Sequence, residues 1–182
     1  MRGHRPPTAM KKTATVYWLL PAKPERELFC EIVRILRKEF RAPNFEPHLT
    51  LFSTTKDRQS PKKVLRQISL RRVRLTTHGV GFSSEFTKTL FIRFKSSDAL
   101  KKLAAALSRA TKSPAKVPSQ PHVSLLYKKL PRAPKKELAA VMKLPLRTVV
   151  FDSIAAVRCA SPSRTTADVE AWRILAKKSL RR

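Results

Sequence analysis

The chain has 182 residues, 42% of them apolar, and 40 Lys and Arg against 12 Asp and Glu give it a formal net charge of +28. This size allows one domain or two closely packed lobes, and no apolar run approaches the ~20 residues of a membrane-spanning helix. The three glycines, at positions 3, 79 and 81, exclude a glycine-rich phosphate loop and with it the folds that bind nucleoside triphosphates or dinucleotides.

The N-terminal segment 1–12 is basic and lacks the apolar stretch of a secretory signal, so we expect a flexible tail there. Residues 13–180 are expected to form a single domain. Cys30 and Cys159 are too few for a disulfide framework or a metal cluster, and both are expected to be reduced thiols. Together these features favour a cytoplasmic, monomeric protein without a membrane anchor.

The first half of the chain predicts alternating strands and helices. Residues 13–20 are rich in β-branched and aromatic side chains and end at Pro21, which is typical of a strand. A helix opens at Pro24 and runs to about residue 41. Its apolar face comprises Leu28, Ile32, Leu36 and Phe40, with Phe29 and Val33 beside them. The half ends with a strand over 45–53, a helix that starts at Ser60-Pro61, and a strand over 72–81.

The second half repeats this alternation. Its predicted elements are a strand over 88–95, a helix from Asp98 to Ser113, a loop over 116–120, a strand over 122–128, a helix over 134–142, a strand over 148–157, a polar loop over 160–168 and a strand over 170–176. The order is β-α-β-α-β and then β-α-β-α-β-β. It predicts an α+β protein of two similar lobes with a cleft between them.

One short motif occurs once in each half, on the strand after the first long helix. The first copy is Pro47-His48-Leu49-Thr50 and the second is Pro121-His122-Val123-Ser124. Side chains alternate along a strand, so a hydroxyl two residues after a histidine points to the same face. Each copy therefore combines a proton-transfer group with a hydrogen-bond donor.

Two such motifs that face each other are suited to in-line displacement at phosphorus. One histidine would activate the attacking oxygen and the other would protonate the leaving oxygen, while Thr50 and Ser124 would hold the non-bridging oxygens. The alternative is that His48 and His122 are buried at strand starts and satisfied by neighbours, but the repetition favours catalysis. His4 and His78 have no partner motif and are expected to be bystanders.

No set of metal ligands accompanies the motifs, because the sequence lacks a His-x₃-His spacing, a cysteine pair or an acidic cluster beside them. We therefore expect neither a metal nor another cofactor. A strained cyclic phosphate has a good internal leaving group, so two imidazoles would be sufficient to open it.

The chain resembles the two-histidine phosphoesterases over roughly residues 14–176, and most of all the cyclic phosphodiesterases of the plant and yeast type. The resemblance rests on the paired motifs, on the strand Val16-Tyr17-Trp18-Leu19-Leu20-Pro21, on Tyr127 and, more weakly, on Trp172. It implies a pseudo-symmetric, two-lobed α+β fold, with an antiparallel sheet in each lobe, helices on the outer faces and a central cleft. It also implies metal-free opening of ADP-ribose 1″,2″-cyclic phosphate and nucleoside 2′,3′-cyclic phosphates to monoesters.

The resemblance also implies roles for individual residues. His48 and His122 would be the acid/base pair, and Thr50 and Ser124 would bind the phosphate. The nucleoside side of the cleft would be lined by Trp18, Tyr127 and Phe86. Tyr127 lies five residues after His122 and so faces away in an unbent strand; a bulge or the strand end would have to turn it inward. For Trp172 we favour core packing.

The charge leaves the substrate open. Residues 56–74 carry eight basic side chains and one acid, and residues 101–147 carry twelve and one. Such a field attracts polyanions such as RNA, although a general cationic composition solvated by water is an equal interpretation. Beside a small-substrate cyclic phosphodiesterase we therefore retain two alternatives. These are an RNA-end enzyme of the same superfamily, acting on 2′,3′-cyclic or 2′-5′ linked RNA, and a non-catalytic basic RNA-binding protein.

Overall fold

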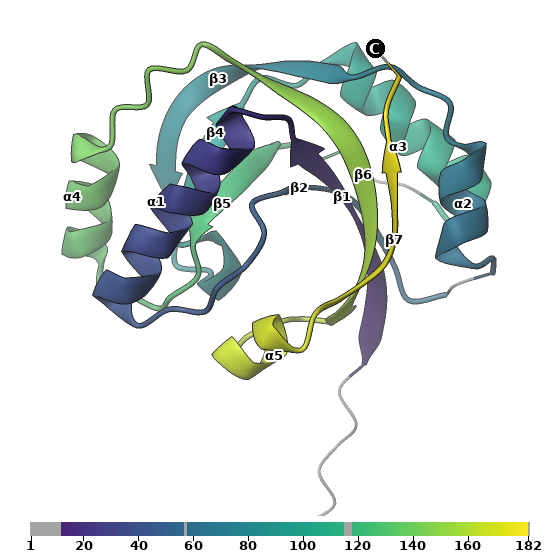
Figure 1. Cartoon of the computed structure of the whole chain (residues 1–182). Helices are drawn as coiled ribbons and strands as arrows, with labels where there is room; N and C mark the ends of the chain where they lie inside the picture. The colour runs from purple at the N-terminus through teal and green to yellow at the C-terminus, as the bar shows by residue number, and fades with distance from the viewer. Residues whose placement is uncertain (1–11, 57, 115–117, 182) are drawn as a thin grey trace, which may run out of the picture.

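The structure is a computed structural model that describes residues 12–56, 58–114 and 118–181. The predicted basic tail, including His4, lies outside the described residues except for Lys12. The described chain folds into seven strands, five α-helices and one 3₁₀ turn (Figure 1). The strands are β1 (Thr13–Pro21), β2 (Leu49–Thr54), β3 (Val73–Phe82), β4 (Leu90–Phe94), β5 (His122–Leu126), β6 (Thr148–Ala160) and β7 (Arg173–Ser179). The helices are α1 (Glu25–Phe40), α2 (Pro61–Gln67), α3 (Asp98–Thr111), α4 (Arg132–Val141) and α5 (Thr166–Glu170), and the 3₁₀ turn is η1 (Phe86–Lys88).

All seven strands belong to one antiparallel sheet with the order β1-β2-β5-β4-β3-β6-β7. β6 also pairs with β1, so the first six strands in this order close into a ring. β6 can do this because it is 13 residues long: one edge pairs first with β3 and then with β7, while the other pairs with β1. The α+β class and the antiparallel pairing are confirmed, and the two halves of the chain share one continuous sheet.

Several predicted boundaries shift for local reasons. The strand predicted over 45–53 begins only at Leu49, since Pro47 has no N–H to donate to a neighbouring strand. Part of the loop predicted over 160–168 and the start of the strand predicted at Glu170 belong instead to α5. The Thr165 hydroxyl and the Asp168 carboxylate form a reciprocal capping box that begins this short helix.

Helix α1 carries opposite charges at its two ends and buries part of its predicted apolar face. Acids occupy its first turn and basic residues its last, and Arg41 ends it in a left-handed conformation with φ of 48°. Phe29, Val33 and Leu36 are buried, whereas Leu28 of the predicted apolar face is 38% exposed. The buried stripe is thus rotated slightly from the predicted one, toward Phe29.

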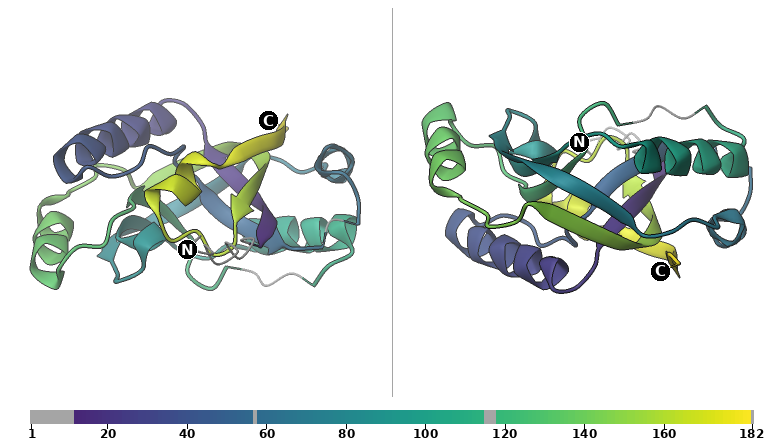
Figure 2. Two further views of the ribbon diagram at one scale, coloured as in Figure 1. Left: turned by 90° about the horizontal axis from the view of Figure 1, so that it is seen from below. Right: turned by 90° about the horizontal axis from the view of Figure 1, so that it is seen from above.

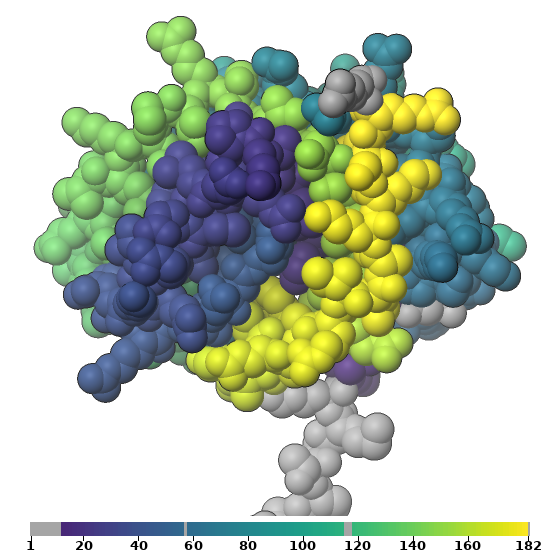
Figure 3. All heavy atoms as spheres, viewed as in Figure 1, coloured from purple at the N-terminus to yellow at the C-terminus, as the bar shows by residue number. Residues whose placement is uncertain are grey.

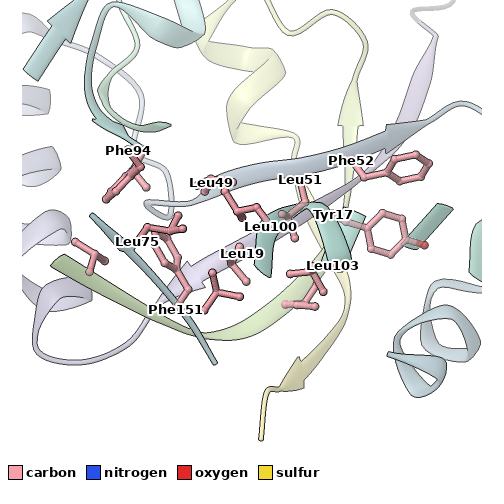
Figure 4. Close-up of a cluster of buried hydrophobic side chains, with 14 of the residues drawn as sticks. Tyr17, Leu19, Leu49, Leu51, Phe52, Leu75, Phe94, Leu100, Leu103 and Phe151 are labelled. Atoms are coloured by element: carbon pink, nitrogen blue, oxygen red, sulfur yellow. The ribbon is translucent and has the colours of Figure 1, made fainter. Parts of the chain in front are cut away.

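The main hydrophobic core lies on one face of the sheet and contains side chains from both halves of the chain (Figure 4). Tyr17 and Leu19 of β1, Leu49 and Leu51 of β2, and Phe151 of β6 all point into it. Leu100 and Leu103 of α3 cover it from the helical side. Because side chains alternate along strands, the residues between these core positions face the other side of the sheet.

Four of the five helices gather at two ends of the molecule, and α5 lies apart from them. α1 and α4 lie together at one end, and α2 and α3 lie at the other, with the sheet between the two pairs (Figures 1 and 2). β7 runs along the surface beside α2 (Figure 3), where the ammonium group of Lys178 donates to the backbone carbonyls of Arg66 and Ile68. Within the described ranges, none of the helices combines the length and the apolar character needed to cross a bilayer.

Candidate active site

The two motifs meet at one junction in the sheet. β2 and β5 are neighbours, and Leu49 is paired with Val123. Since the pairing is antiparallel, His48 is level with Ser124, and Thr50 is level with His122. Leu49 and Val123 point into the core, so these four polar residues point to the opposite face. The result is a four-cornered arrangement in which each histidine has the hydroxyl of the other motif beside it.

A cavity of about 400 Å³ lies over this arrangement. Six of the predicted site residues line it: Trp18, His48, Thr50, His122, Ser124 and Tyr127. Most of the remaining wall comes from the segment around η1, from the end of β6 and the residues just after it, and from Trp172. Sequence positions that are more than 100 residues apart thus share one site.

Each imidazole is held by a hydrogen bond to the backbone two residues before it. Nδ1 of His48 lies 2.6 Å from the backbone oxygen of Glu46, and Nδ1 of His122 lies 2.8 Å from the backbone oxygen of Gln120. A carbonyl oxygen only accepts, so each Nδ1 carries a proton and donates it. Each Nε2 is then the nitrogen available for proton transfer, and the two tautomers match.

The surroundings of the two histidines differ. His48 is buried, and its ring stacks on the indole of Trp18 with centroids 3.7 Å apart and planes within 10°. This burial lowers the pKa of His48 from 6.5 to about 4. His122 is only half-buried, with Phe91 at its edge, and burial lowers its pKa as well, opposed in part by its bond to the Gln120 carbonyl.

The hydroxyls sit at opposite corners of the arrangement. Thr50 is exposed, whereas Ser124 is buried and donates to the backbone carbonyl of Thr87 over 2.9 Å. The segment that carries Thr87 is fixed by a buried lysine of α4, because the ammonium group of Lys135 donates to the carbonyl of Ser83 at 2.8 Å. Helix α4 therefore helps to shape the wall over the second motif.

Tyr127 reaches the cavity through the irregularity that the sequence required. Ser124 pairs with Phe91 and Leu126 pairs with Leu90, so the β4–β5 register shifts between them. This bulge and the end of β5 turn Tyr127 to the side of His122. Its ring stacks on Phe45 at 3.8 Å and 9°, and burial raises its pKa.

Phe86 lies behind this tyrosine: the two ring centroids are 6.3 Å apart, and Phe86 is not among the residues that line the cavity. Trp18 does line the cavity, but His48 covers one of its faces. The role of these aromatic residues toward a nucleoside therefore stays a prediction.

Ten of the lining residues were not predicted to belong to the site, and two of them, Trp172 and Lys88, bear directly on its chemistry. Trp172, for which packing was favoured, meets the edge of His48 at 5.8 Å and donates from Nε1 to the Ser163 hydroxyl at 3.0 Å. Lys88 supplies a positive charge, with its ammonium group 4.8 Å from the centre of the Phe91 ring and hydrogen-bonded to Gln120. The sequence pointed to Trp172 through its weaker part in the family resemblance. Nothing in the sequence distinguished Lys88 from the other lysines.

The remaining titratable candidates lie apart from this chemistry or are chemically inert. Cys159 touches the cavity, but burial raises its pKa to about 12, so the thiol stays neutral. Cys30 is exposed on α1, and His78 lines a different cavity. The described residues include no group of three or more histidine, cysteine or acidic side chains arranged to hold a metal ion.

Comparison with known proteins identifies the family. Residues 23–160 match the 2′-5′ RNA ligase superfamily, and the chain belongs to this superfamily of two-histidine phosphoesterases, as its paired motifs predicted. A curated relative is the cyclic phosphodiesterase of Arabidopsis thaliana, which is 25% identical over 130 residues that cover 70% of this chain and 72% of the relative. The predicted likeness to the plant-type cyclic phosphodiesterases is confirmed, and the chain is a phosphoesterase.

Solved structures agree on the fold. Escherichia coli LigT complexed with 3′-AMP is 16% identical, with a TM-score of 0.57, and the match covers 94% of this chain and 99% of that one. The Thermus thermophilus protein TT0787 is 18% identical, with a TM-score of 0.57, and the match covers 92% and 98%. At these identities the likeness concerns the fold alone, and it confirms the predicted two-histidine phosphoesterase fold.

Proposed function

We propose that this phosphoesterase is a metal-independent cyclic phosphodiesterase that opens ribose cyclic phosphates to phosphomonoesters. Its substrates would be nucleoside 2′,3′-cyclic phosphates and ADP-ribose 1″,2″-cyclic phosphate. The observation that carries the proposal is the pair of imidazoles that face one cavity, each with Nδ1 bound to a backbone carbonyl and Nε2 available. The named activity of the Arabidopsis thaliana relative supports the same reaction class.

The difference in burial assigns the proton-transfer roles. His48, with its pKa lowered to about 4, is neutral near pH 7 and is the general base. It takes a proton from water as the water oxygen attacks phosphorus. His122 lies nearer to solvent and beside the phosphate, whose negative charge favours the protonated imidazole. It gives its proton to the ribose oxygen as the P–O bond of the ring breaks.

The hydroxyls and Lys88 stabilise the charge on phosphorus. Thr50 and Ser124 stand on either side of the junction. Thr50 is placed to donate to one non-bridging oxygen, and Ser124 donates to another when its O–H turns from the Thr87 carbonyl to the phosphate. Lys88 adds a positive charge at the cavity wall. Trp172 is half-buried and is the aromatic ring we assign to contact with the base, since Trp18 is covered by His48 and Tyr127 by Phe45.

The test is turnover of both substrates by single variants, with EDTA present throughout. His48→Ala and His122→Ala should each lower kcat by about 10²–10⁴, and because the two groups act in one step, the double variant should be little worse than either. Circular dichroism checks that the variants fold. Near-full activity of either variant, or activity in the wild type that needs an added metal, would contradict the mechanism.

A matched pair of threonines tests phosphate binding. Thr50→Val removes a hydroxyl inside the cavity and should lower kcat/KM by roughly tenfold, the cost of a hydrogen bond to a charged group. Thr55→Val removes the same group from an exposed position just after β2 and should have little effect. Equal effects of the two substitutions would show that the Thr50 hydroxyl does not bind the phosphate.

The second candidate is an RNA-end enzyme of the same superfamily, and the net charge of +28 favours it. Such an enzyme would act on the same chemical group at the end of a polynucleotide. Comparing kcat/KM for a nucleoside 2′,3′-cyclic phosphate with that for an oligonucleotide with a 2′,3′-cyclic end separates the two. Turnover of the oligonucleotide alone would favour the RNA-end enzyme.

A further inference from the structure

A second cavity adjoins the active site on the same face of the sheet. It has a volume of about 540 Å³ and lies against β3, β4 and the residues just before His122. A shallower cavity of about 350 Å³ connects the two, because it shares Ser119 and Gln120 with the second cavity and Thr50, Lys88 and His122 with the active site. A continuous path thus leads from His122 to the second cavity.

The strand register places an arginine in this path. Arg93 of β4 is paired with His122 of β5, so the two side chains rise from the same face with Cβ atoms about 5 Å apart. Arg93 extends away from His122 and over β3, where a Cβ atom built on Gly79 would lie 3.6 Å from Nη2 of the arginine. The guanidinium group therefore lies beside Gly79, and Arg93 is one of the residues that line the second cavity.

Two glycines lie beside this arginine, and one of them, Gly81, lines the second cavity. Gly79 and Gly81 lie two positions apart on β3 and are two of the three glycines in the chain. Gly79 has φ of +82°, and a Cβ atom on Gly81 would lie 2.8 Å from the ring of Phe91. Glycine inside a strand is typical of a place where a ring, a ligand or another chain approaches the backbone closely. Here Phe91 covers Gly81, and the space over Gly79 is left to Arg93.

The charge of Arg93 is available to a ligand. Its side chain is exposed, and none of the ion pairs among the described residues involves it. A guanidinium group offers a planar fork of N–H donors that matches two oxygens of a phosphate. Gln120 on the connecting path adds an amide group beside it.

We propose that the second cavity binds a second phosphate of the substrate, with Arg93 as its principal ligand. The inference rests on the proposed function, in which the cyclic phosphate sits between His48 and His122. A second phosphate on the same nucleotide is one ribose away, and the path from His122 toward Arg93 is where we place it. The preferred substrates are then cyclic phosphates that also carry a 5′-phosphate group, whether terminal or part of a longer chain.

Three substrates test this with the full-length protein: adenosine 2′,3′-cyclic phosphate, its 5′-phosphorylated form, and the dinucleotide ApA with a 2′,3′-cyclic end. The wild type should turn over the 5′-phosphorylated form with a kcat/KM at least roughly tenfold higher than the unphosphorylated one, chiefly through KM. A similar gain for the dinucleotide shows that a phosphodiester also fits, and no gain shows that a terminal phosphate is required. Equal kcat/KM for all three would overturn the proposal.

Variants assign the preference to Arg93. Arg93→Ala should bring the ratio of the two mononucleotide kcat/KM values close to one, and Arg93→Lys should keep part of it. Arg74→Ala is the matched control, because it removes the same charge from an exposed position of the neighbouring strand that does not line the cavity. If Arg74→Ala lowers the ratio as much as Arg93→Ala does, the preference reflects overall charge and the site does not exist.

Binding of product analogues separates this inference from the proposed function. Calorimetry should show tighter binding of adenosine 3′,5′-bisphosphate than of adenosine 3′-monophosphate, and Arg93→Ala should remove the difference. This result would support the phosphate site even if the protein turned over none of the three substrates, which would itself refute the proposed function. Equal affinities for the two ligands in the wild type would refute the site even if turnover were efficient.

Discussion

At the scale of single residues, two chemically equal histidines are made different by their surroundings. Neutral His48 is required as the base, so kcat/KM should rise with pH through its pKa of about 4. Protonated His122 is required as the acid, and its pKa is lowered from 6.5, so kcat/KM should fall again as the pH rises through that lower value. The prediction is a bell-shaped profile for a nucleoside 2′,3′-cyclic phosphate with its maximum between about pH 4 and 6.5.

Replacing Trp18 tests whether burial of His48 sets the acidic limb of this profile. Burial is the largest cause of the lowered pKa of His48, and Trp18 covers one face of the ring. Trp18→Ala should therefore move the acidic limb upward from about pH 4 toward 6.5 and narrow the bell. A maximum above pH 6.5 in the wild type, or an acidic limb that Trp18→Ala leaves in place, would contradict the assigned roles.

At the scale of elements, helix α1 supports the first motif through one ion pair. Arg26 donates from Nε to the Glu46 carboxylate over 2.6 Å, and the backbone carbonyl of the same Glu46 holds Nδ1 of His48. The second motif gets its support differently, from α4 through Lys135 and the segment around η1. Arg26 is thus a positioning residue that acts on His48 through the backbone.

Replacing Arg26 tests this support. Arg26→Ala should lower kcat by several-fold with little change in KM and should shift the acidic limb of the pH profile, since the Glu46 carbonyl would no longer be fixed. Arg26→Lys should restore part of the activity. Arg34→Ala is the control on the same helix, because Arg34 pairs with Glu31 on the exposed side. A pH profile unchanged in Arg26→Ala would contradict the positioning role.

How much of these elements was predictable depends on the range of the interaction. The motif strands, α1 and the common face of His48 and Thr50 follow from local periodicity. The capping box of α5 is also a local feature, formed by Thr165 and Asp168. The polar composition of the segment predicts a loop there instead. The inward turn of Tyr127 depends on the β4–β5 register, and the contact of Trp172 with His48 depends on how distant strands meet. Neither has a local signal.

At the scale of the whole molecule, the closed ring joins the two halves into one core. Phe151 illustrates this, since it pairs with Pro21 of β1 on one edge and with Val73 of β3 on the other, and its side chain is fully buried. We therefore predict one unfolding transition in urea, with coincident curves from far-ultraviolet circular dichroism and from the fluorescence of Trp18 and Trp172. Curves that separate would show that the halves unfold independently.

A core variant sharpens the same experiment. Phe151→Ala should lower the free energy of unfolding by about 3–5 kcal/mol and move both curves together. Val141→Ala, at a position that is 74% exposed on α4, should change the midpoint very little. A shift of only one curve in Phe151→Ala would contradict a single cooperative unit.

The junction between the two motif strands has a consequence for motion. β2 and β5 are joined at one residue pair, Leu49 and Val123, which makes this the most sparsely paired seam of the ring. Local opening of a fold begins where few backbone hydrogen bonds resist it. The amides at this seam should thus exchange with deuterium sooner than those of β1 and β6, whose register is continuous over much of their length. A phosphate that contacts Thr50 and Ser124 at once would link β2 to β5. Bound substrate should therefore slow the exchange of these amides.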